Sequence, residues 1–112
     1  MLSSRLVYGA GGIMLEKDIE RKCVTMAKNR DMLAWKFTSP GTAGVPDRIF
    51  VTADGVVFFV EFKKPGGRLS PLQKRHLDKL EARGVPAFVV HSVEEFEHAV
   101  TTLPTRGGGP PL

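Results

Sequence analysis

The sequence contains almost no cysteine and no long apolar run. Cys23 is the only cysteine among 112 residues, which excludes an intramolecular disulfide and any zinc site built from several cysteines. No stretch approaches the roughly eighteen apolar residues that a membrane-spanning helix needs. Residues 6–15 contain three glycines and no small-residue cleavage pattern. We therefore expect a cytoplasmic protein without a membrane segment.

Other familiar signatures are missing as well. His76, His91 and His98 lack the spacing of metal ligands, and we assign them no role. The glycines at 9–12 follow no predicted strand at the spacing of a phosphate-binding loop, so we expect no nucleotide cofactor. A bound metal would therefore have to be held by oxygen atoms.

What is present is the composition of one compact domain. Apolar residues make up 42% of the chain and charged residues 25%, which is ordinary for a globular domain of this length. Residues 1–13 show no periodicity, and residues 104–112 are mostly proline and glycine. We expect both ends to be flexible and a single domain to span 14–103.

The net charge of +4 is concentrated in one segment. Residues 61–84 contain seven basic and three acidic residues, whereas the rest of the chain is balanced. The basic residues are Lys63, Lys64, Arg68, Lys74, Arg75, Lys79 and Arg83. Such a segment is expected where a polyanion docks, although a solvated helix face has the same charge pattern.

Residue patterns predict the first four elements. Residues 15–30 lack glycine and proline and predict a helix, which a strand over 33–37 follows. Two runs at 48–52 and 56–63 are rich in β-branched and aromatic residues and flank an Asp54-Gly55 turn. These runs predict an antiparallel hairpin.

The second half of the chain predicts a helix, a strand and a last helix. Ser70 and Gln73 predict a capping box, and Gly84 ends that helix before a strand over 86–91. Ser92 and Glu95 predict a second capping box. The buried stripe of the last helix consists of Phe96, Ala99, Val100 and Leu103. A hairpin followed by a helical crossover implies a mixed sheet flanked by helices, so the fold class is α/β, in the order αβββαβα.

The first predicted helix carries carboxylates on its apolar side. On a helical wheel Glu16 and Glu20 fall within the apolar arc. That arc consists of Ile19, Cys23, Val24, Met26 and Ala27. Acidic residues in a first turn complement the helix dipole, which explains Glu16 better than Glu20. Otherwise the two like charges indicate a positive group nearby.

The hairpin also carries charges where apolar residues are expected. Alternation along 56–63 places Glu61 and Lys63 on one face. Asp47 starts the preceding strand directly after Pro46, and pairing in the hairpin can bring it close to Glu61. A structural ion pair would explain Glu61 and Lys63, and a turn aspartate would explain Asp47.

Together these carboxylates suit a hard cation. Mg²⁺ takes oxygen ligands and keeps several waters, so two carboxylates and one backbone carbonyl can form half of its shell. Phosphodiester hydrolysis uses such a metal to neutralise a non-bridging oxygen and to lower the pKa of a bound water. Lys63 would orient the attacking water or stabilise the developing charge.

With their neighbours, these residues resemble the PD-(D/E)xK nuclease superfamily. Its motif is matched by Pro46-Asp47 and, after the hairpin, by Glu61-Phe62-Lys63. Residues 16–20, 44–47, 61–63 and 69–73 together resemble the virus-type replication-repair nuclease (VRR-NUC) domain in its short stand-alone phage or bacterial form. The resemblance covers about 15–97. It implies a restriction-endonuclease-like αβββαβ core, with a C-terminal helix added here, and makes 14–103 a nuclease domain.

The resemblance implies a metal-dependent endonuclease site. Asp47 and Glu61 would hold Mg²⁺ or Mn²⁺ with the backbone carbonyl of Phe62, and Lys63 would be the catalytic lysine. Gln73 matches the family's helix glutamine near the site, beside its role in the capping box.

The same resemblance assigns a helix carboxylate to the site. Glu16 would act on the metal directly or through water. Glu20 is the alternative, and it departs from the family pattern because a glutamine is common there. We favour Glu16.

The resemblance also implies structure-selective cleavage of branched DNA, such as Holliday junctions, by a homodimer in DNA repair in a bacterial or phage-infected cell. Symmetric cleavage of a junction suits two active sites related by a twofold axis. The expected DNA-backbone contacts are Lys36, Ser39, Arg48, Lys64, Arg68, Lys74 and Arg75. The lone Trp35 lies in a predicted strand, and we expect it in the core.

Two other functions compete with the nuclease. A non-catalytic module on the same fold could bind nucleic acid with the same basic segment. A buried network of salt bridges could use the same charges as scaffold. The complete set of Glu16, Asp47, Glu61 and Lys63 favours the nuclease.

Overall fold

The computed structural model describes residues 15–105. Their elements follow one another as α1 (Glu16–Asn29), β1 (Leu33–Lys36), β2 (Arg48–Val51), β3 (Val57–Phe62), α2 (Pro71–Ala82), β4 (Ala87–Val90) and α3 (Val93–Thr101). This is the order that the sequence predicts. Of the flexible segments expected at 1–13 and 104–112, the first and residues 106–112 of the second lie outside the described residues.

The four strands form one mixed sheet in the order β1-β2-β3-β4. β2 is antiparallel to both β1 and β3, whereas β3 and β4 are parallel. A two-strand hairpin needs only a tight turn, but a parallel pair needs a long crossover, which α2 supplies. The expected α/β class is confirmed.

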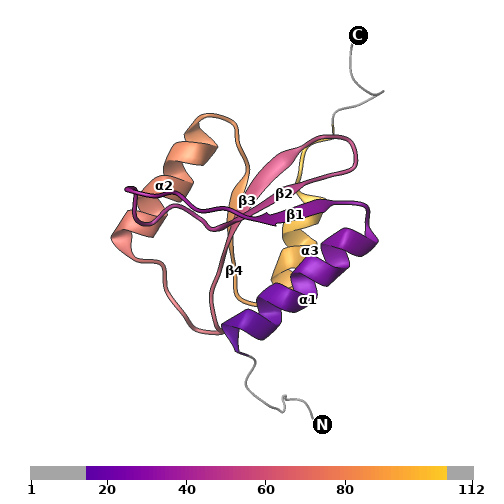
Figure 1. Ribbon diagram of the computed structural model, residues 1–112, viewed down its shortest axis with the longest axis horizontal. Coiled ribbons are helices and arrows are strands. Elements are labelled where there is room, and N and C mark those ends of the chain that lie inside the picture. Colours follow the sequence, from indigo (N-terminus) through magenta and orange to yellow (C-terminus); the bar gives the residue numbers. More distant parts are fainter. Residues whose placement is uncertain (1–14, 106–112) are drawn as a thin grey trace.

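One face of the sheet carries the hydrophobic core. Phe50, Phe58 and Phe62 point to this face and pack on Phe96 of α3, with ring centroids 5.2 to 6.4 Å apart. Helix α1 adds the buried residues Ile19, Cys23 and Ala27. Burial of each large side chain stabilises the fold by about 1.5–3 kcal/mol. Figure 1 shows α1 and α3 together on this side of the sheet, with α2 on the other.

The capping box predicted for α2 is present. The Ser70 hydroxyl accepts a hydrogen bond from the Gln73 N–H (3.1 Å), and the Gln73 side-chain oxygen accepts one from the Ser70 N–H (2.8 Å). Beyond the other end of α2, Gly84 has a φ of +80°, a left-handed conformation that glycine adopts without strain. Local sequence therefore defines both ends of α2.

The capping box predicted for α3 is only half formed. Ser92 accepts a hydrogen bond from the Glu95 N–H as expected. The Glu95 carboxylate, however, bonds the backbone N–H of His91 (2.7 Å) and lies 3.0 Å from the His91 Nδ1. Burial alone would raise the Glu95 pKa, but these contacts with His91 lower it. The prediction failed because a histidine one residue earlier competes for the same carboxylate.

The expectation that Trp35 belongs to the core is wrong. Trp35 is 57% exposed, because β1 is an edge strand and only its Ala34 is buried. Trp35 points to the face opposite the phenylalanine core, where its register partner is Ile49. Helix α1 packs on the core side of β1, whereas on the other face α2 packs against β4 and leaves Trp35 uncovered.

Candidate active site

Strands β2 and β3 bring Asp47 and Glu61 to the same end of the sheet. Arg48 is the register partner of Val60, so one step further along the antiparallel pair Asp47 stands opposite Glu61. Pro46 is fully buried and anchors the chain that delivers Asp47 to β2. The hairpin thus produces the pair of carboxylates that the sequence predicts.

The loop before Asp47 packs directly on the start of α2. Gly44 has a φ of +85°, and a Cβ added there would lie 2.8 Å from the Leu72 Cγ and 3.3 Å from the Gln73 backbone nitrogen. Only glycine combines this conformation with this close approach. The loop and the first turn of α2 are therefore locked together beside the two carboxylates.

The Glu61 carboxylate is partly buried and has several other carboxylates near it. Burial and the neighbouring charge of Asp47 raise the pKa of Glu61 to about 7, and the charges of Glu16 and Glu20 act in the same direction. Lys63 opposes them and lowers the pKa. Three other carboxylates thus act electrostatically on Glu61, and a cation beside it would offset their repulsion.

Gln73 forms the capping box that the sequence predicts and also contacts Glu61. Its side-chain oxygen completes the capping box, and its Nε2 donates to the Glu61 Oε2 over 3.4 Å. The first turn of α2 therefore orients Glu61. An amide can do both because it has a donor and an acceptor on one planar group.

Lys63 continues β3 beyond its last strand residue. Its backbone N–H donates to the Val90 carbonyl (2.9 Å), which extends the parallel ladder. By alternation its half-buried side chain shares the face of Glu61. The following loop packs tightly on it, since a Cβ at Gly67 would lie 3.3 Å from the Lys63 Cβ.

The two helix carboxylates occupy different surroundings. Glu20 is half-buried and binds the Arg48 Nε (2.5 Å) and the Lys36 Nζ (3.1 Å). Burial alone would raise the Glu20 pKa, but these two cations lower it. Glu16 is exposed and acts on Glu61 only through its charge. Glu20 is therefore engaged in ion pairs, and Glu16 is the carboxylate that solvent reaches.

Two of the expected DNA contacts belong to this ion-pair network. Arg48 is largely covered and bonds Glu20, while Lys36 lies between Glu20 and Asp47, 3.4 Å from the latter. The hydrogen bond to Glu20, and also the charge of Asp47, raise the pKa of Lys36 even though burial opposes this. In this arrangement both cations neutralise carboxylates of the site.

The donor set fits Mg²⁺ or Mn²⁺ rather than zinc. Within residues 15–105 no three His, Cys, Asp or Glu side chains gather closely enough to enclose a metal. Mg²⁺ needs only one or two carboxylates because it keeps several waters. Asp47 and Glu61 would supply those carboxylates, and a divalent cation there would offset the charge repulsion that adds to burial in raising the pKa of Glu61.

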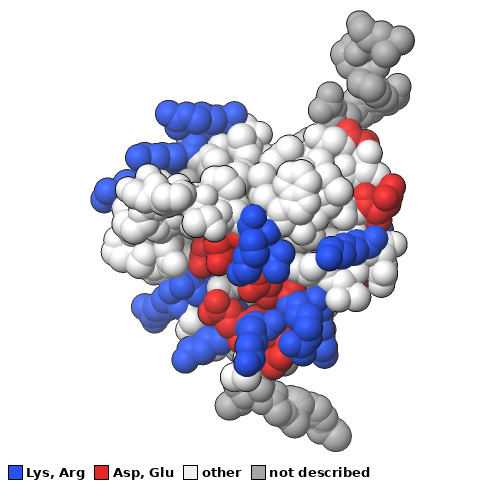
Figure 2. Space-filling view, in the orientation of Figure 1, with Lys and Arg blue, Asp and Glu red and all other residues white. Residues whose placement is uncertain are grey.

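The remaining expected DNA contacts lie mostly on exposed positions. Lys64, Arg68, Lys74 and Arg75 are exposed, and Lys74 pairs with Asp78 one turn away (2.9 Å). Ser39 is half-buried in the loop between β1 and β2. Figure 2 shows basic side chains over α2 and acidic side chains between basic ones near the start of α1.

Sequence reasoning missed the contact that His91 makes. The His91 Nε2 donates to the Gly67 carbonyl (2.8 Å), and its other ring nitrogen faces Glu95. His91 thereby fastens the loop that follows Lys63 to the start of α3. The closeness of His91 to Glu95 in the sequence was a signal for their contact, but nothing local indicated the contact with Gly67, which lies 24 residues away.

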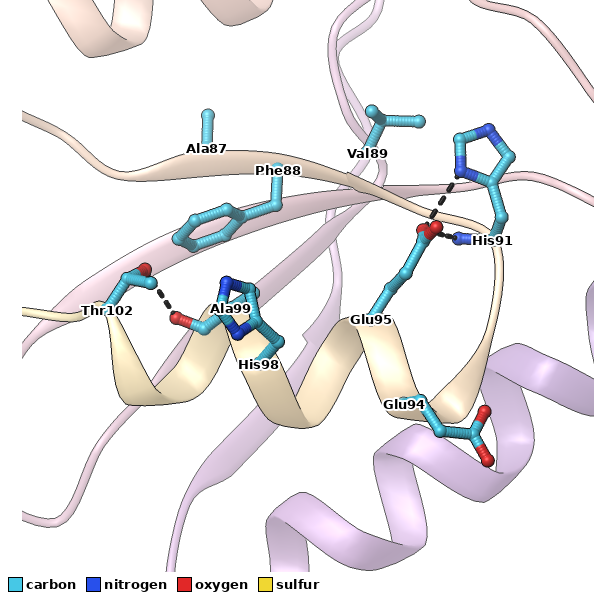
Figure 3. Close-up of a pocket in the computed structure, with 9 residues that line it drawn as sticks. All are labelled: Ala87, Phe88, Val89, His91, Glu94, Glu95, His98, Ala99 and Thr102. Atoms are coloured by element: carbon cyan, nitrogen blue, oxygen red, sulfur yellow. Dashed lines mark hydrogen bonds and ion pairs between the residues drawn. The ribbon is translucent and has the colours of Figure 1, made fainter.

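His91 also lines a pocket between β4 and α3. This pocket has a volume of about 600 Å³, and His98 and Thr102 line it from α3 and its C-terminal end (Figure 3). It contains neither Asp47 nor Glu61 nor Lys63. The carboxylate pair at the end of β2 and β3, rather than this pocket, is therefore the candidate active site.

The architecture is that of a restriction-endonuclease-like α/β domain, and comparisons with known proteins agree. Residues 16–94 match the VRR-NUC domain family. A solved structure described as a VRR_NUC domain superimposes with a TM-score of 0.73 at 24% identity, covering 80% of this chain and 97% of that one. The likeness to that structure concerns the fold.

A curated phage protein is similar as well. "Putative nuclease p44" of Acyrthosiphon pisum secondary endosymbiont phage 1 is 38% identical over 80 residues, covering 71% of this chain and 86% of the phage protein. The chain belongs to the VRR-NUC family.

Proposed function

We propose that the protein is a metal-dependent endodeoxyribonuclease that uses Mg²⁺ or Mn²⁺. Membership of the VRR-NUC family and the likeness to a phage nuclease support a nuclease. The observation that carries the finer assignment is the placement of Asp47 opposite Glu61, with Gln73 bonded to Glu61. Two carboxylates at adjacent strand ends suit a hard cation beside a phosphodiester.

Each residue of the site has a separate task. Asp47, Glu61 and the Phe62 carbonyl would hold the cation, and Glu16 would reach it through water. A bound Mg²⁺ supplies charge for the phosphate and lowers the pKa of a water. Lys63 orients that water or stabilises the charge that develops on the phosphate oxygens. Gln73 keeps the Glu61 carboxylate in position.

We further propose that the substrate is branched DNA, such as a Holliday junction, and that the enzyme acts as a homodimer in a bacterial or phage-infected cell. One domain of this size contacts few phosphates, whereas two copies place two sites on a symmetric junction. Exposed basic residues of α2 and of the preceding loop would bind the DNA backbone. They include Lys64, Arg68, Lys74 and Arg75.

Cleavage of defined DNA tests the proposal. Four-way junctions, flaps and linear duplex are incubated with protein and Mg²⁺, Mn²⁺ or chelator. We expect metal-dependent cutting that Lys63→Ala lowers at least about a hundredfold, while Lys22→Ala, at an exposed position of α1, stays at the wild-type rate. Sedimentation of the protein with and without the junction measures the dimer.

The alternative is a non-catalytic module that binds nucleic acid. The position of the Lys36 ammonium between Glu20 and Asp47 favours the binding module, because Lys36 neutralises these carboxylates without a metal. Binding that falls with salt, with no cutting by wild type or Lys63→Ala in any metal, would establish this alternative and remove the nuclease.

A further inference from the structure

A cavity of about 310 Å³ lies on the same sheet face as Glu61, between the strands and α2. Its wall is apolar and consists of Phe37, Val45, Phe59 and Leu80. This volume is at the lower end of the range for small-ligand pockets. None of the candidate catalytic residues lines it, so the cavity is a separate feature of the molecule.

The cavity adjoins the two carboxylates through the strand register. The Phe37 N–H donates to the Asp47 carbonyl (2.8 Å), so Phe37 stands beside Asp47 on the neighbouring strand. Phe59 precedes Glu61 by two residues on β3 and therefore shares its face. The carboxylates form one row across the sheet, and the aromatic residues flank that row.

The aromatic wall is open to an incoming ring. Phe37 and Phe59 meet edge to face, with centroids 5.8 Å apart and planes at 83°. Phe37 remains 36% exposed, so part of its ring faces solvent beside the two carboxylates. The exposed part of the Phe37 ring is a surface on which a further aromatic ring can pack.

The rim of the cavity is basic. His76, Lys79 and Arg83 of α2 and its C-terminal end border the apolar wall. The Arg83 guanidinium also bonds the Lys79 carbonyl (3.1 Å), which holds it near the helix end. An apolar aromatic floor with a cationic rim suits a planar base whose attached phosphates are negative.

We propose that this cavity takes a single unstacked base of the DNA, next to the phosphate that is cut. The proposal rests on the proposed function and names the feature of the substrate that the site reads. A base leaves its stack most easily at a branch point or in a single strand. The cavity thereby selects branched or single-stranded DNA over continuous duplex.

Binding measurements with Phe37 variants test the cavity. Affinities for a flap with a single-stranded arm and for a linear duplex are measured in the Lys63→Ala background, so that no DNA is cut. Phe37→Ala should weaken flap binding about tenfold, because loss of one stacked base has that scale. Duplex binding should change less than twofold, and Phe37→Tyr should restore flap binding.

Trp35→Leu is the matched control. Trp35 is an exposed aromatic residue on the same face of the sheet, and it does not line the cavity. We expect it to leave the preference for the flap unchanged. Urea unfolding of each variant confirms that the fold is retained.

Four results would overturn the proposal. Phe37→Ala could bind both DNAs with wild-type affinity, or it could lose affinity for both by the same factor. Trp35→Leu could also show the selective loss of flap affinity that is expected for Phe37→Ala. A fourth is that Phe37→Ala converts a dimer to a monomer, which would make the cavity an interface between copies. If wild type cuts no DNA while Phe37→Ala still loses flap binding selectively, the result supports the base-binding cavity and contradicts the nuclease activity.

Discussion

Glu61 is the residue where the fold most changes the chemistry of a side chain. Its pKa is raised to about 7 by burial and by Asp47, whereas a free glutamate titrates near 4.5. A carboxylate with a raised pKa holds its proton longer in the folded than in the unfolded chain. Without metal, ionisation of Glu61 therefore lowers the free energy of unfolding.

The ionisation of Glu61 predicts how stability depends on pH without metal. The Glu61 contribution is fully favourable below about pH 4.5 and is lost as the pH rises through 7. For a half-buried group partly screened by solvent, we expect a loss of about 1–2 kcal/mol. Urea unfolding in chelator from pH 4.5 to 8, with Glu61→Gln as reference, measures it. Parallel curves for the two proteins would contradict the prediction.

Addition of metal completes the same experiment. At pH 8, Mg²⁺ should raise the free energy of unfolding of wild type, because a ligand that binds only the folded state stabilises it. Glu61→Gln and Asp47→Asn should respond much less. An equal response of all three proteins would place the cation elsewhere.

Cys23 is the opposite case, because its buried position makes its thiol unreactive. It is fully buried in α1, and burial together with the charges of Glu94, Glu20 and Glu97 raises its pKa to about 12. The native protein should react with a thiol reagent at pH 8 at least about a hundredfold more slowly than the urea-unfolded protein. Comparable rates would show that α1 opens readily.

At the scale of elements, the contact between the loop before Asp47 and α2 organises the site. Gly44 allows the loop to lie against Leu72, and the same turn of α2 presents Gln73 to Glu61. Local sequence defines each of these elements, since Ser70 caps α2 and Pro46 leads into β2. Their docking then sets the position of both carboxylates.

Gly44→Ala tests this docking. The new Cβ would lie 2.8 Å from the Leu72 Cγ and 3.2 Å from its backbone carbon, at a φ of +85°. We expect a loss of about 2–3 kcal/mol in the free energy of unfolding, with lower cleavage activity. Gly41→Ala is the control, because its φ is +80° in open space, and it should cost about 1 kcal/mol. Equal losses would mean that backbone strain alone matters.

At the scale of the whole molecule, basic residues and exposed apolar residues gather on different elements. Basic residues cover α2 and the loop before it, and three of the exposed large apolar residues, Leu33, Trp35 and Phe37, lie in β1 or directly after it. The exposed Arg75 represents the first group, and Phe37 the second. On the proposed function, the two groups would make different contributions to DNA binding, one independent of DNA structure and one selective for unstacked bases.

Arg75→Ala tests the charge contribution. We expect branched and linear DNA to bind more weakly by a similar factor of about three to ten, and the slope of affinity against salt to fall by about one. Lys22→Ala on α1 is the control and should change neither quantity. A loss confined to branched DNA would assign Arg75 to recognition of the branch instead.

The order and the ends of the helices and strands were predictable from the sequence because their causes are local. Ser70, Gly84 and the Asp54-Gly55 turn act over a few residues, so the order of elements and the pairing of Asp47 with Glu61 follow from the sequence. Trp35 was mispredicted because strand composition does not reveal which strand lies at an edge. The partner of Glu95 was mispredicted because two donors compete for one carboxylate.

By itself, the sequence determined the α/β order, the hairpin that aligns two carboxylates, and the family. Only the tertiary structure decided that Glu20 pairs with Arg48 and Lys36, that His91 holds the loop after Lys63, and that Phe37 and Phe59 open a cavity beside the site. The physical reason is distance along the chain. These contacts join residues many positions apart, and packing of α1 and α2 on opposite faces of the sheet brings them together.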